Sequence, residues 1–217
     1  MTQDTLSLKV QQLQAGFPER LVQLPDGSRV AWREAGNVAG KAADEFAVVL
    51  LHGISSGAAS WLDLALALGD KVRVLAWDAP GYGVSTPLTQ PAPGDADYAR
   101  ALEQSLQALG VRRCLLVGHS LGALMAARLA GTAPGLVEQL VLISPAGGYG
   151  APAKAEQQAK VRQGRLAALA EKGVAGLAAV IDQRLVSAEA PESVRAWVRW
   201  NTARMQPQGY AQAVELL

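Results

Sequence analysis

The chain has 217 residues, of which 50% are hydrophobic, so it is long enough for one domain with a sizeable core and too apolar to be disordered. Its formal net charge is +1 without a block of basic residues, which excludes the electrostatic footprint of a nucleic-acid-binding protein. Residues 1–19 are polar and lack a signal-peptide pattern, and no apolar run is long enough to cross a bilayer. We therefore expect a cytoplasmic protein with no membrane partner.

One cysteine and two histidines limit the chemistry available to the chain. A single cysteine excludes an internal disulfide, and Cys114 lies in an apolar segment, so we interpret it as a core residue. The sequence has no His-Glu-x-x-His motif, no phosphate loop and no complete dinucleotide-binding motif. It accordingly predicts no metal site and no cofactor.

The first predicted elements form an antiparallel hairpin, at residues 20–24 and 29–33, around a Pro-Asp-Gly-Ser turn. After a loop at 36–44, apolar runs typical of strands buried on both faces recur at 47–51, 72–77, 113–117 and 139–143. Helices are predicted between them, at 60–68, at 96–109 and directly after residue 122. Strands that alternate with helices predict an α/β fold with a doubly wound, mostly parallel sheet and flanking helices.

The composition changes after a Gly- and Pro-rich segment at 145–152, which we interpret as a linker or hinge. Beyond it no strand-like run occurs, and helices are predicted at 155–171, 174–186, 192–204 and 209–217. We therefore divide the chain into a core at 1–147 and a helical lid at 148–217. Several apolar lid side chains either pack on the core or line a substrate pocket: Leu166, Leu177, Val180, Trp197 and Trp200.

The segment most informative about function is Gly118-His119-Ser120-Leu121-Gly122. It lies between the apolar run at 113–117 and a helix rich in small residues, which is the context of a nucleophile elbow. The sharp turn leaves no room for side chains at Gly118 and Gly122 and exposes the Ser120 hydroxyl at the sheet edge. The following helix N-terminus favours a developing negative charge. The pattern predicts Ser120 as a nucleophile for acyl transfer.

Two other segments follow buried strands. His52 and Gly53 come directly after the strand at 47–51, where backbone N–H groups could bind a tetrahedral oxyanion together with the N–H of Leu121. The segment Asp-Ala-Pro-Gly-Tyr-Gly-Val-Ser at 78–85 comes after the next strand. All three segments are expected at the same edge of a parallel sheet.

In order and spacing, these three segments resemble those of the α/β-hydrolase family, specifically its lid-bearing branch of esterases, lactonases and carbon–carbon hydrolases. The resemblance runs from about residue 20 to residue 143, with the lid after it. It implies that the amides of Ile54 and Leu121 form the oxyanion hole. It also implies a supporting role for Gly53, Gly118, His119 and Gly122, and a structural role for Asp78, Gly81, Gly83 and Ser85. Tyr82, with Trp197 from the lid, is a candidate for lining the pocket.

The sequence departs from the family in its general base. His52 is interpreted as support for the oxyanion loop, and His119 is expected to project away from Ser120. After residue 143 the first acidic residue is Glu156, already in the lid, whereas the family carries its acid and histidine behind two further strands. The fold is therefore expected to be C-terminally incomplete, with 139–143 as an open apolar sheet edge. The chain is a fragment, which we favour, or a partner chain supplies the strands, or it is a shortened non-catalytic derivative.

Taken together, the residues predict a serine hydrolase that acts on a carboxylic ester, a lactone or a similar apolar small-molecule carbonyl compound through an acyl-enzyme. Two alternatives stay open: a catalytically incomplete binding module on the same scaffold, and an acyltransferase that uses the same Ser120. No oligomeric state is predicted.

Overall fold

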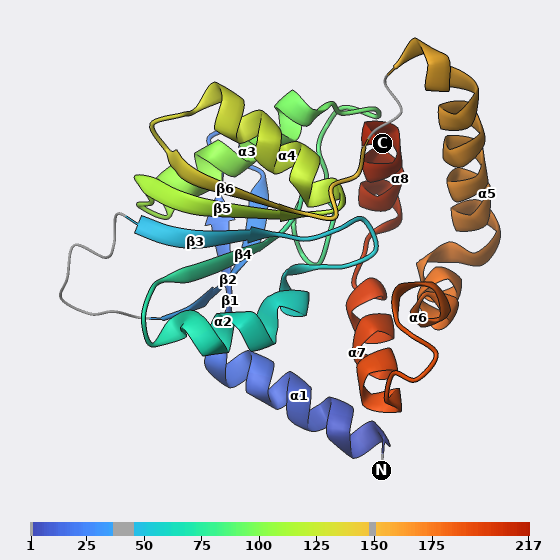
Figure 1. The fold of residues 1–217 in the computed structure, drawn as a ribbon, viewed down its shortest axis with the longest axis horizontal. Helices are drawn as coiled ribbons and strands as arrows, with labels where there is room; N and C mark the ends of the chain where they lie inside the picture. The colour runs from blue at the N-terminus through green and yellow to red at the C-terminus, as the bar shows by residue number, and fades with distance from the viewer. Residues whose placement is uncertain (1, 37–45, 148–150) are drawn as a thin grey trace.

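The computed structural model describes residues 2–36, 46–147 and 151–217 (Figure 1). Within these ranges, a sheet of six strands has the order β1-β2-β4-β3-β5-β6. The strands are β1 (Glu19–Gln23), β2 (Arg29–Ala35), β3 (Phe46–Leu51), β4 (Val74–Asp78), β5 (Arg113–His119) and β6 (Val137–Ile143). The predicted loop at 36–44 lies almost entirely outside the described residues, and so does part of the predicted hinge at 145–152.

The strand pairing confirms the predicted hairpin and the predicted parallel sheet. β1 and β2 pair antiparallel, and β2 pairs antiparallel with β4. The strands β4, β3, β5 and β6 run parallel to their neighbours. Every predicted strand is present, and the observed bounds differ from the predicted ones by one or two residues at the ends.

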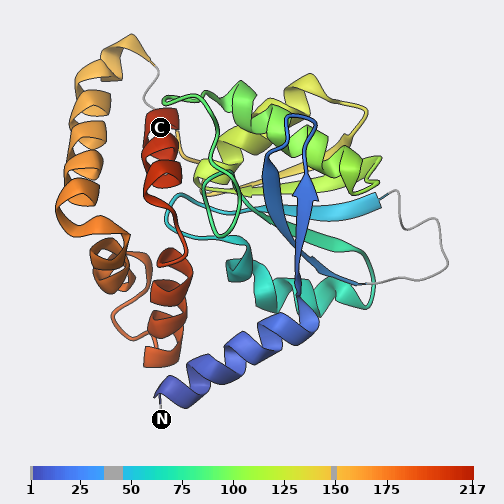
Figure 2. The ribbon, with the colours of Figure 1, turned by 180° about the vertical axis from the view of Figure 1, so that it is seen from behind.

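Helices cover both faces of the sheet, as expected of a doubly wound fold (Figures 1 and 2). One face carries α3 (Asp95–Ala108) and α4 (Leu121–Thr132). The other carries α2 (Leu62–Gly69), which follows the 3₁₀ turn η2 (Ala58–Trp61). Buried apolar side chains form one cluster on each side of the sheet, and the strands β2, β3, β4 and β5 contribute alternate residues to the two clusters.

The helix α1 (Thr2–Gly16) was not predicted from the sequence. Leu6, Val10, Leu13 and Phe17 follow one another at helical spacing and pack into the same cluster as α2. Leu13 and Phe17 are almost completely buried, at 1% and 0% exposure. The apolar stripe is narrow and the rest of the segment is polar, so the sequence did not indicate a helix here. The stripe packs the N-terminal helix below the sheet in the view of Figure 2.

The C-terminal region is helical, as predicted, and lies across one end of the sheet (Figure 1). It contains η3 (Pro152–Lys154), α5 (Ala155–Val180), α6 (Asp182–Leu185), α7 (Glu192–Thr202) and α8 (Pro207–Leu216). The break at Gly173 (φ 60°) inside α5 lies at the predicted boundary between the helices at 155–171 and 174–186. The predicted helix at 174–186 is interrupted at Ile181, between α5 and α6. α8 packs into the core through Tyr210, Ala213 and Val214.

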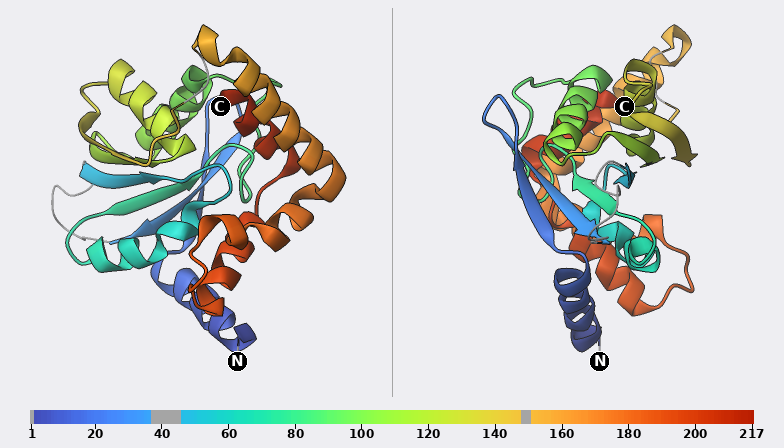
Figure 3. Two further views of the ribbon diagram at one scale, coloured as in Figure 1. Left: turned by 45° about the vertical axis from the view of Figure 1, so that its right-hand side comes forward. Right: turned by 90° about the vertical axis from the view of Figure 1, so that its left-hand side faces the viewer.

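The strand β6 forms an edge of the sheet within the described residues (Figure 3). Consecutive apolar side chains on it, which therefore point to both faces, are 38–42% exposed: Leu140, Val141, Leu142 and Ile143. A strand with this composition is normally buried on both faces. The expected open apolar edge is therefore confirmed.

Candidate active site

The turn between β5 and α4 places Ser120 in a strained backbone conformation. Ser120 has φ 53° and ψ −115°, a region that residues with a Cβ rarely adopt. A Cβ on Gly118 would lie 2.6 Å from the carbonyl oxygen of Gly122, and a Cβ on Gly122 would lie 2.6 Å from that of Leu51. Glycine at both positions lets α4 approach the sheet closely enough to form this turn.

The loop after β3 lies against Ser120. A Cβ on Gly53 would be 3.2 Å from the Cβ of Ser120, so the backbones of the two segments are nearly in contact. Within the described chain, the amides of Ile54 and Leu121 donate no hydrogen bond to a protein acceptor. Two buried residues therefore present unpaired N–H groups beside the serine, and buried donors of this kind normally have a partner.

Hydrogen bonds from two directions hold this loop. The hydroxyl of Tyr82 donates to the carbonyl oxygen of Ile54 at 2.8 Å, and the hydroxyl of Thr202 in α7 donates to that of Ser55 at 2.7 Å. Tyr82 is 1% exposed, and burial raises the pKa of its hydroxyl far above the ordinary value, so the hydroxyl remains a donor. The C-terminal helical region thus helps to position the loop.

His52 uses both of its ring nitrogens within the protein. The backbone N–H of Ala79 donates to Nε2 at 3.1 Å, so Nδ1 carries the proton and donates to the Gly53 carbonyl oxygen at 2.9 Å. The ring is 3% exposed, and burial lowers its pKa. His52 therefore ties the loop after β3 to the loop after β4 and has no free nitrogen to accept a proton from Ser120.

His119 lies closer to the site than its elbow position suggested. Its ring lies against the loop after β3, with Nδ1 3.2 Å from the position of a Cβ on Gly53. The residue lines the same cavity as Ser120, and in the described chain no hydrogen bond joins its ring to that serine. Desolvation lowers the pKa of the imidazole, which is therefore neutral near pH 7.

The segment after β4 makes structural contacts only. Asp78 Oδ1 accepts the backbone N–H of Ala58 at 2.7 Å. A Cβ on Gly83, which has φ 53°, would lie 2.5 Å from Asp78 Oδ2. The Ser85 hydroxyl donates to the Asp78 carbonyl oxygen at 2.6 Å and accepts the N–H of Ala31 at 2.9 Å. These bonds fix the turn that carries Tyr82.

A cavity of about 260 Å³ joins the elbow, the loop after β3 and the C-terminal helices. Its walls include Ser120, Gly53, Ile54, Ser55, Ser56, His119, Leu177, Val180, Ile181 and Leu185. Neither Tyr82 nor Trp197 lines it, so their predicted place in the pocket wall is wrong. Tyr82 turns its hydroxyl toward the loop backbone, and Trp197 stacks on Trp200 with ring centroids 4.9 Å apart.

Sequence reasoning missed seven residues that line this cavity from the C-terminal region: Arg165, Ile181, Arg184, Leu185, Thr202, Met205 and Tyr210. They come from the helices α5 to α8 and from the connections between them, whose relative orientation depends on how the helices pack. A polar residue on an amphipathic helix is ordinarily assigned to the solvent face, so the sequence carried no signal that these arginines face the elbow.

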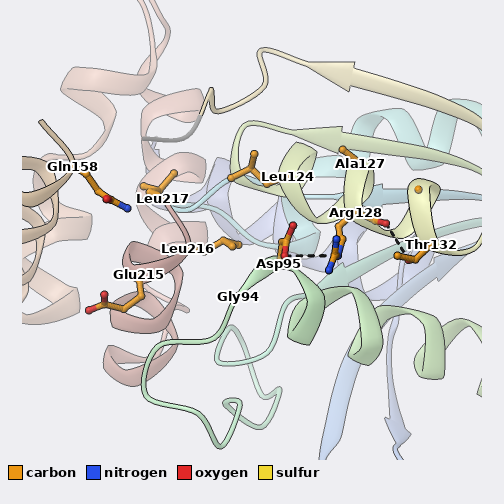
Figure 4. Close-up of a pocket in the computed structure, with 11 residues that line it drawn as sticks. Gly94, Asp95, Leu124, Ala127, Arg128, Thr132, Gln158, Glu215, Leu216 and Leu217 are labelled. Atoms are coloured by element: carbon orange, nitrogen blue, oxygen red, sulfur yellow. Dashed lines mark hydrogen bonds and ion pairs between the residues drawn. The ribbon is translucent and has the colours of Figure 1, made fainter. Parts of the chain in front are cut away.

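A larger cavity of about 620 Å³ lies where α4, α5 and the end of α8 meet (Figure 4). Leu124, Arg128, Gln158 and Leu217 are on its walls, whereas Ser120 is not. Asp95 and Arg128 form an ion pair across it at 3.7 Å. The smaller cavity, which Ser120 and the loop after β3 line, is therefore the candidate active site.

In the described residues, no cluster of three or more His, Cys, Asp or Glu side chains is arranged to hold a metal ion. The same part of the chain has no helix long and apolar enough to cross a membrane. Cys114 is completely buried, and burial raises the pKa of its thiol to about 12, which keeps it protonated and unreactive at neutral pH.

Comparison with known proteins places this fold and site in a family. The family described as alpha/beta hydrolase fold matches residues 47–209. The chain therefore belongs to the α/β-hydrolase family, as its three loop segments indicated.

Several of the similar proteins are named as hydrolases. A hydrolase from Pseudomonas aeruginosa PA01 is 25% identical, with a TM-score of 0.72 over 91% of this chain and 71% of its own. The enol-lactonase from Burkholderia xenovorans LB400 has a TM-score of 0.77 at 23% identity, over 90% of this chain and 72% of its own. A putative carbamate hydrolase of Variovorax paradoxus is 40% identical over 103 residues, which are 47% of this chain and 39% of that protein. The matches to curated mycobacterial relatives span only 33% of the relatives' length.

Proposed function

We propose that this chain is the nucleophile-bearing part of a serine hydrolase. Ser120 attacks a substrate carbonyl carbon, the C–O bond to the leaving alcohol breaks, and water then hydrolyses the acyl-enzyme. The observation that carries the proposal is a strained Ser120 beside two amides, those of Ile54 and Leu121, that have no protein acceptor in the described chain. Ser120 and Ile54 line the same cavity, and Leu121 directly follows Ser120. Strained residues and unpaired buried donors are concentrated at functional sites.

The two amides supply the electrostatic part of this mechanism. In the tetrahedral intermediate the carbonyl oxygen becomes an oxyanion, which accepts hydrogen bonds from the N–H groups of Ile54 and Leu121. One such donor is worth about 3 kcal/mol of barrier in a preorganised site. Leu121 is also the first residue of α4, whose N-terminal partial positive charge stabilises the same oxyanion.

The Ser120 hydroxyl must give its proton to a base, and none of the described residues is positioned to act as that base. Both nitrogens of His52 are occupied, and no hydrogen bond joins His119 to Ser120 in the described chain. We propose that the base and its acidic partner belong to a polypeptide segment that pairs with β6. Two observations support this proposal: four apolar side chains are exposed on β6, and this chain covers only 71% of the Pseudomonas hydrolase. The base takes the serine proton and returns it to the leaving alcohol.

The cavity favours a small ester or lactone. Its volume of about 260 Å³ is at the lower end for ligand sites, and Leu177, Val180 and Ile181 give it an apolar wall from the C-terminal helices. The relatives named as an enol-lactonase and a putative carbamate hydrolase support a carbonyl substrate. An acyltransferase would use the same serine but form more product with an added alcohol or thiol than with water.

The test is intact-mass measurement of the purified chain, at 22.7 kDa, before and after treatment with a fluorophosphonate. Ser120→Ala should abolish labelling, whereas Ser56→Ala, which changes another serine of the same cavity, should leave it unchanged. A single adduct on Ser120 supports the hydrolase and shows that a base is available to this chain or to an associated partner. Labelling that requires a longer polypeptide supports a base carried on that segment. No labelling in either protein would overturn the proposal in favour of a binding module.

A further inference from the structure

The charges around the Ser120 cavity are all of one sign. Two of its lining residues, Arg165 and Arg184, are cationic, and none of its lining residues is an aspartate or a glutamate. His119, on the same wall, is neutral near pH 7 because burial lowers its pKa. The cavity is therefore locally positive in a chain whose formal net charge is only +1.

The two arginines also differ from the other arginines of the C-terminal helical region. Four arginines there form ion pairs: Arg162 with Glu215, Arg195 with Asp182, Arg199 with Asp182 and Glu192, and Arg204 with Glu19. In the described part of the chain, neither Arg165 nor Arg184 has an acidic partner within 4.0 Å. Arg165 makes only a long hydrogen bond from Nη1 to the Tyr210 hydroxyl, at 3.3 Å. The unpaired guanidinium groups are thus the two that face the serine.

A guanidinium group presents a fork of donors that matches the two oxygens of a carboxylate. We propose that the substrate of this site is an ester or lactone that also carries a carboxylate. Arg165 and Arg184 bind the carboxylate while the reacting carbonyl lies at Ser120. The apolar side chains of Leu177, Val180 and Ile181 contact the carbons that separate the two groups. The inference rests on the proposed function for the position of the reacting carbonyl, but the anion site itself does not.

Binding of two matched esters tests the anion site without any catalytic step. The chain carrying Ser120→Ala, which cannot turn the ligand over, is titrated calorimetrically with monomethyl glutarate and with dimethyl glutarate. The two ligands differ in one charged group. We expect the half-ester to bind at least about tenfold more tightly, because hydrogen bonds to charged groups contribute more than neutral ones. Raising the ionic strength should reduce this preference.

Substitution of the arginines in that Ser120→Ala background locates the preference. Arg165→Gln and Arg184→Gln should each weaken half-ester binding, by about tenfold for the better-buried Arg165, and leave diester binding unchanged. Arg162→Gln removes the same charge from the same helix outside the cavity and should change either affinity by less than about twofold. Arg165→Lys keeps the positive charge but lacks the two-pronged donor geometry of a guanidinium group, so it should weaken half-ester binding by less than Arg165→Gln does. It takes the place of Arg165→Gln if that variant does not fold.

Equal affinity for the two esters would overturn the proposal, as would a complete lack of binding by both. An equal loss of diester binding in the arginine variants would also overturn it, since the arginines would then shape the cavity rather than bind an anion. Failure of the proposed function is a separate result. A chain without a reactive Ser120 would resist the fluorophosphonate and still prefer the half-ester.

Discussion

The strain at Ser120 can be measured by replacing the residue in two ways. Ser120→Ala and Ser120→Gly both remove the hydroxyl, but only glycine adopts φ 53° and ψ −115° without a steric penalty. We therefore expect the glycine variant to be the more stable of the two. Ordinarily the order is reversed, because glycine loses more backbone entropy on folding.

The size of the effect follows from two opposing terms. Relief of a strained backbone conformation is worth about 1–3 kcal/mol, and the additional entropy lost by glycine is about 0.5–1 kcal/mol. The difference predicts that Ser120→Gly is more stable than Ser120→Ala by up to about 2.5 kcal/mol. Urea unfolding followed by circular dichroism measures this as a higher midpoint at an unchanged slope.

A matched pair at an unstrained serine gives the control. Ser60 lies in the 3₁₀ turn η2 and is not among the residues with positive φ. There Ser60→Gly should be less stable than Ser60→Ala by about 0.5–1 kcal/mol. If Ser120→Gly were also the less stable variant of its pair, the elbow would not be strained, and the strongest structural sign of a nucleophile would be lost.

Three further perturbations test other parts of the structure. Gly122→Ala puts a Cβ 2.6 Å from the carbonyl oxygen of Leu51 and should lower the free energy of unfolding in urea by about 2–3 kcal/mol. Gly131→Ala is the control in the same helix: the added Cβ meets open space, so this variant should be slightly more stable than the parent chain. The pKa of His52 is lowered in the folded chain, so below the ordinary histidine pKa of 6.5 the unfolded chain binds more protons than the folded one. The free energy of unfolding should therefore fall on acidification through that pH, with a limiting slope of about 1.4 kcal/mol per pH unit from this residue. Unfolding curves between about pH 7 and pH 5.5 measure that slope, and an unchanged slope in His52→Gln would contradict the assignment. Val141→Lys on the exposed β6 edge should reduce concentration-dependent association in light scattering without lowering the unfolding midpoint, because the side chain is 42% exposed.

Local patterns were sufficient to predict the parallel strands and the elbow. A run such as 47–51 is apolar at every position, which suits a strand covered on both faces, and Gly118 and Gly122 mark a turn that only glycine allows. The same local rules failed for α1, whose stripe of Leu6, Val10, Leu13 and Phe17 is embedded in polar residues. They placed the helix boundary near Gly173 correctly but missed the interruption at Ile181, between α5 and α6.

The sequence by itself predicted Ser120 as the nucleophile, the amides of Ile54 and Leu121 beside it and a structural role for both histidines, because each prediction depends on neighbours within a few residues. The tertiary structure alone decided what faces that nucleophile. It moved Tyr82 and Trp197 out of the cavity wall and brought Arg165 and Arg184 into it. The physical reason is that side chains from α5 and α6 reach Ser120 only through the packing of whole helices against the sheet, and that packing sums many weak apolar contacts that no local pattern records.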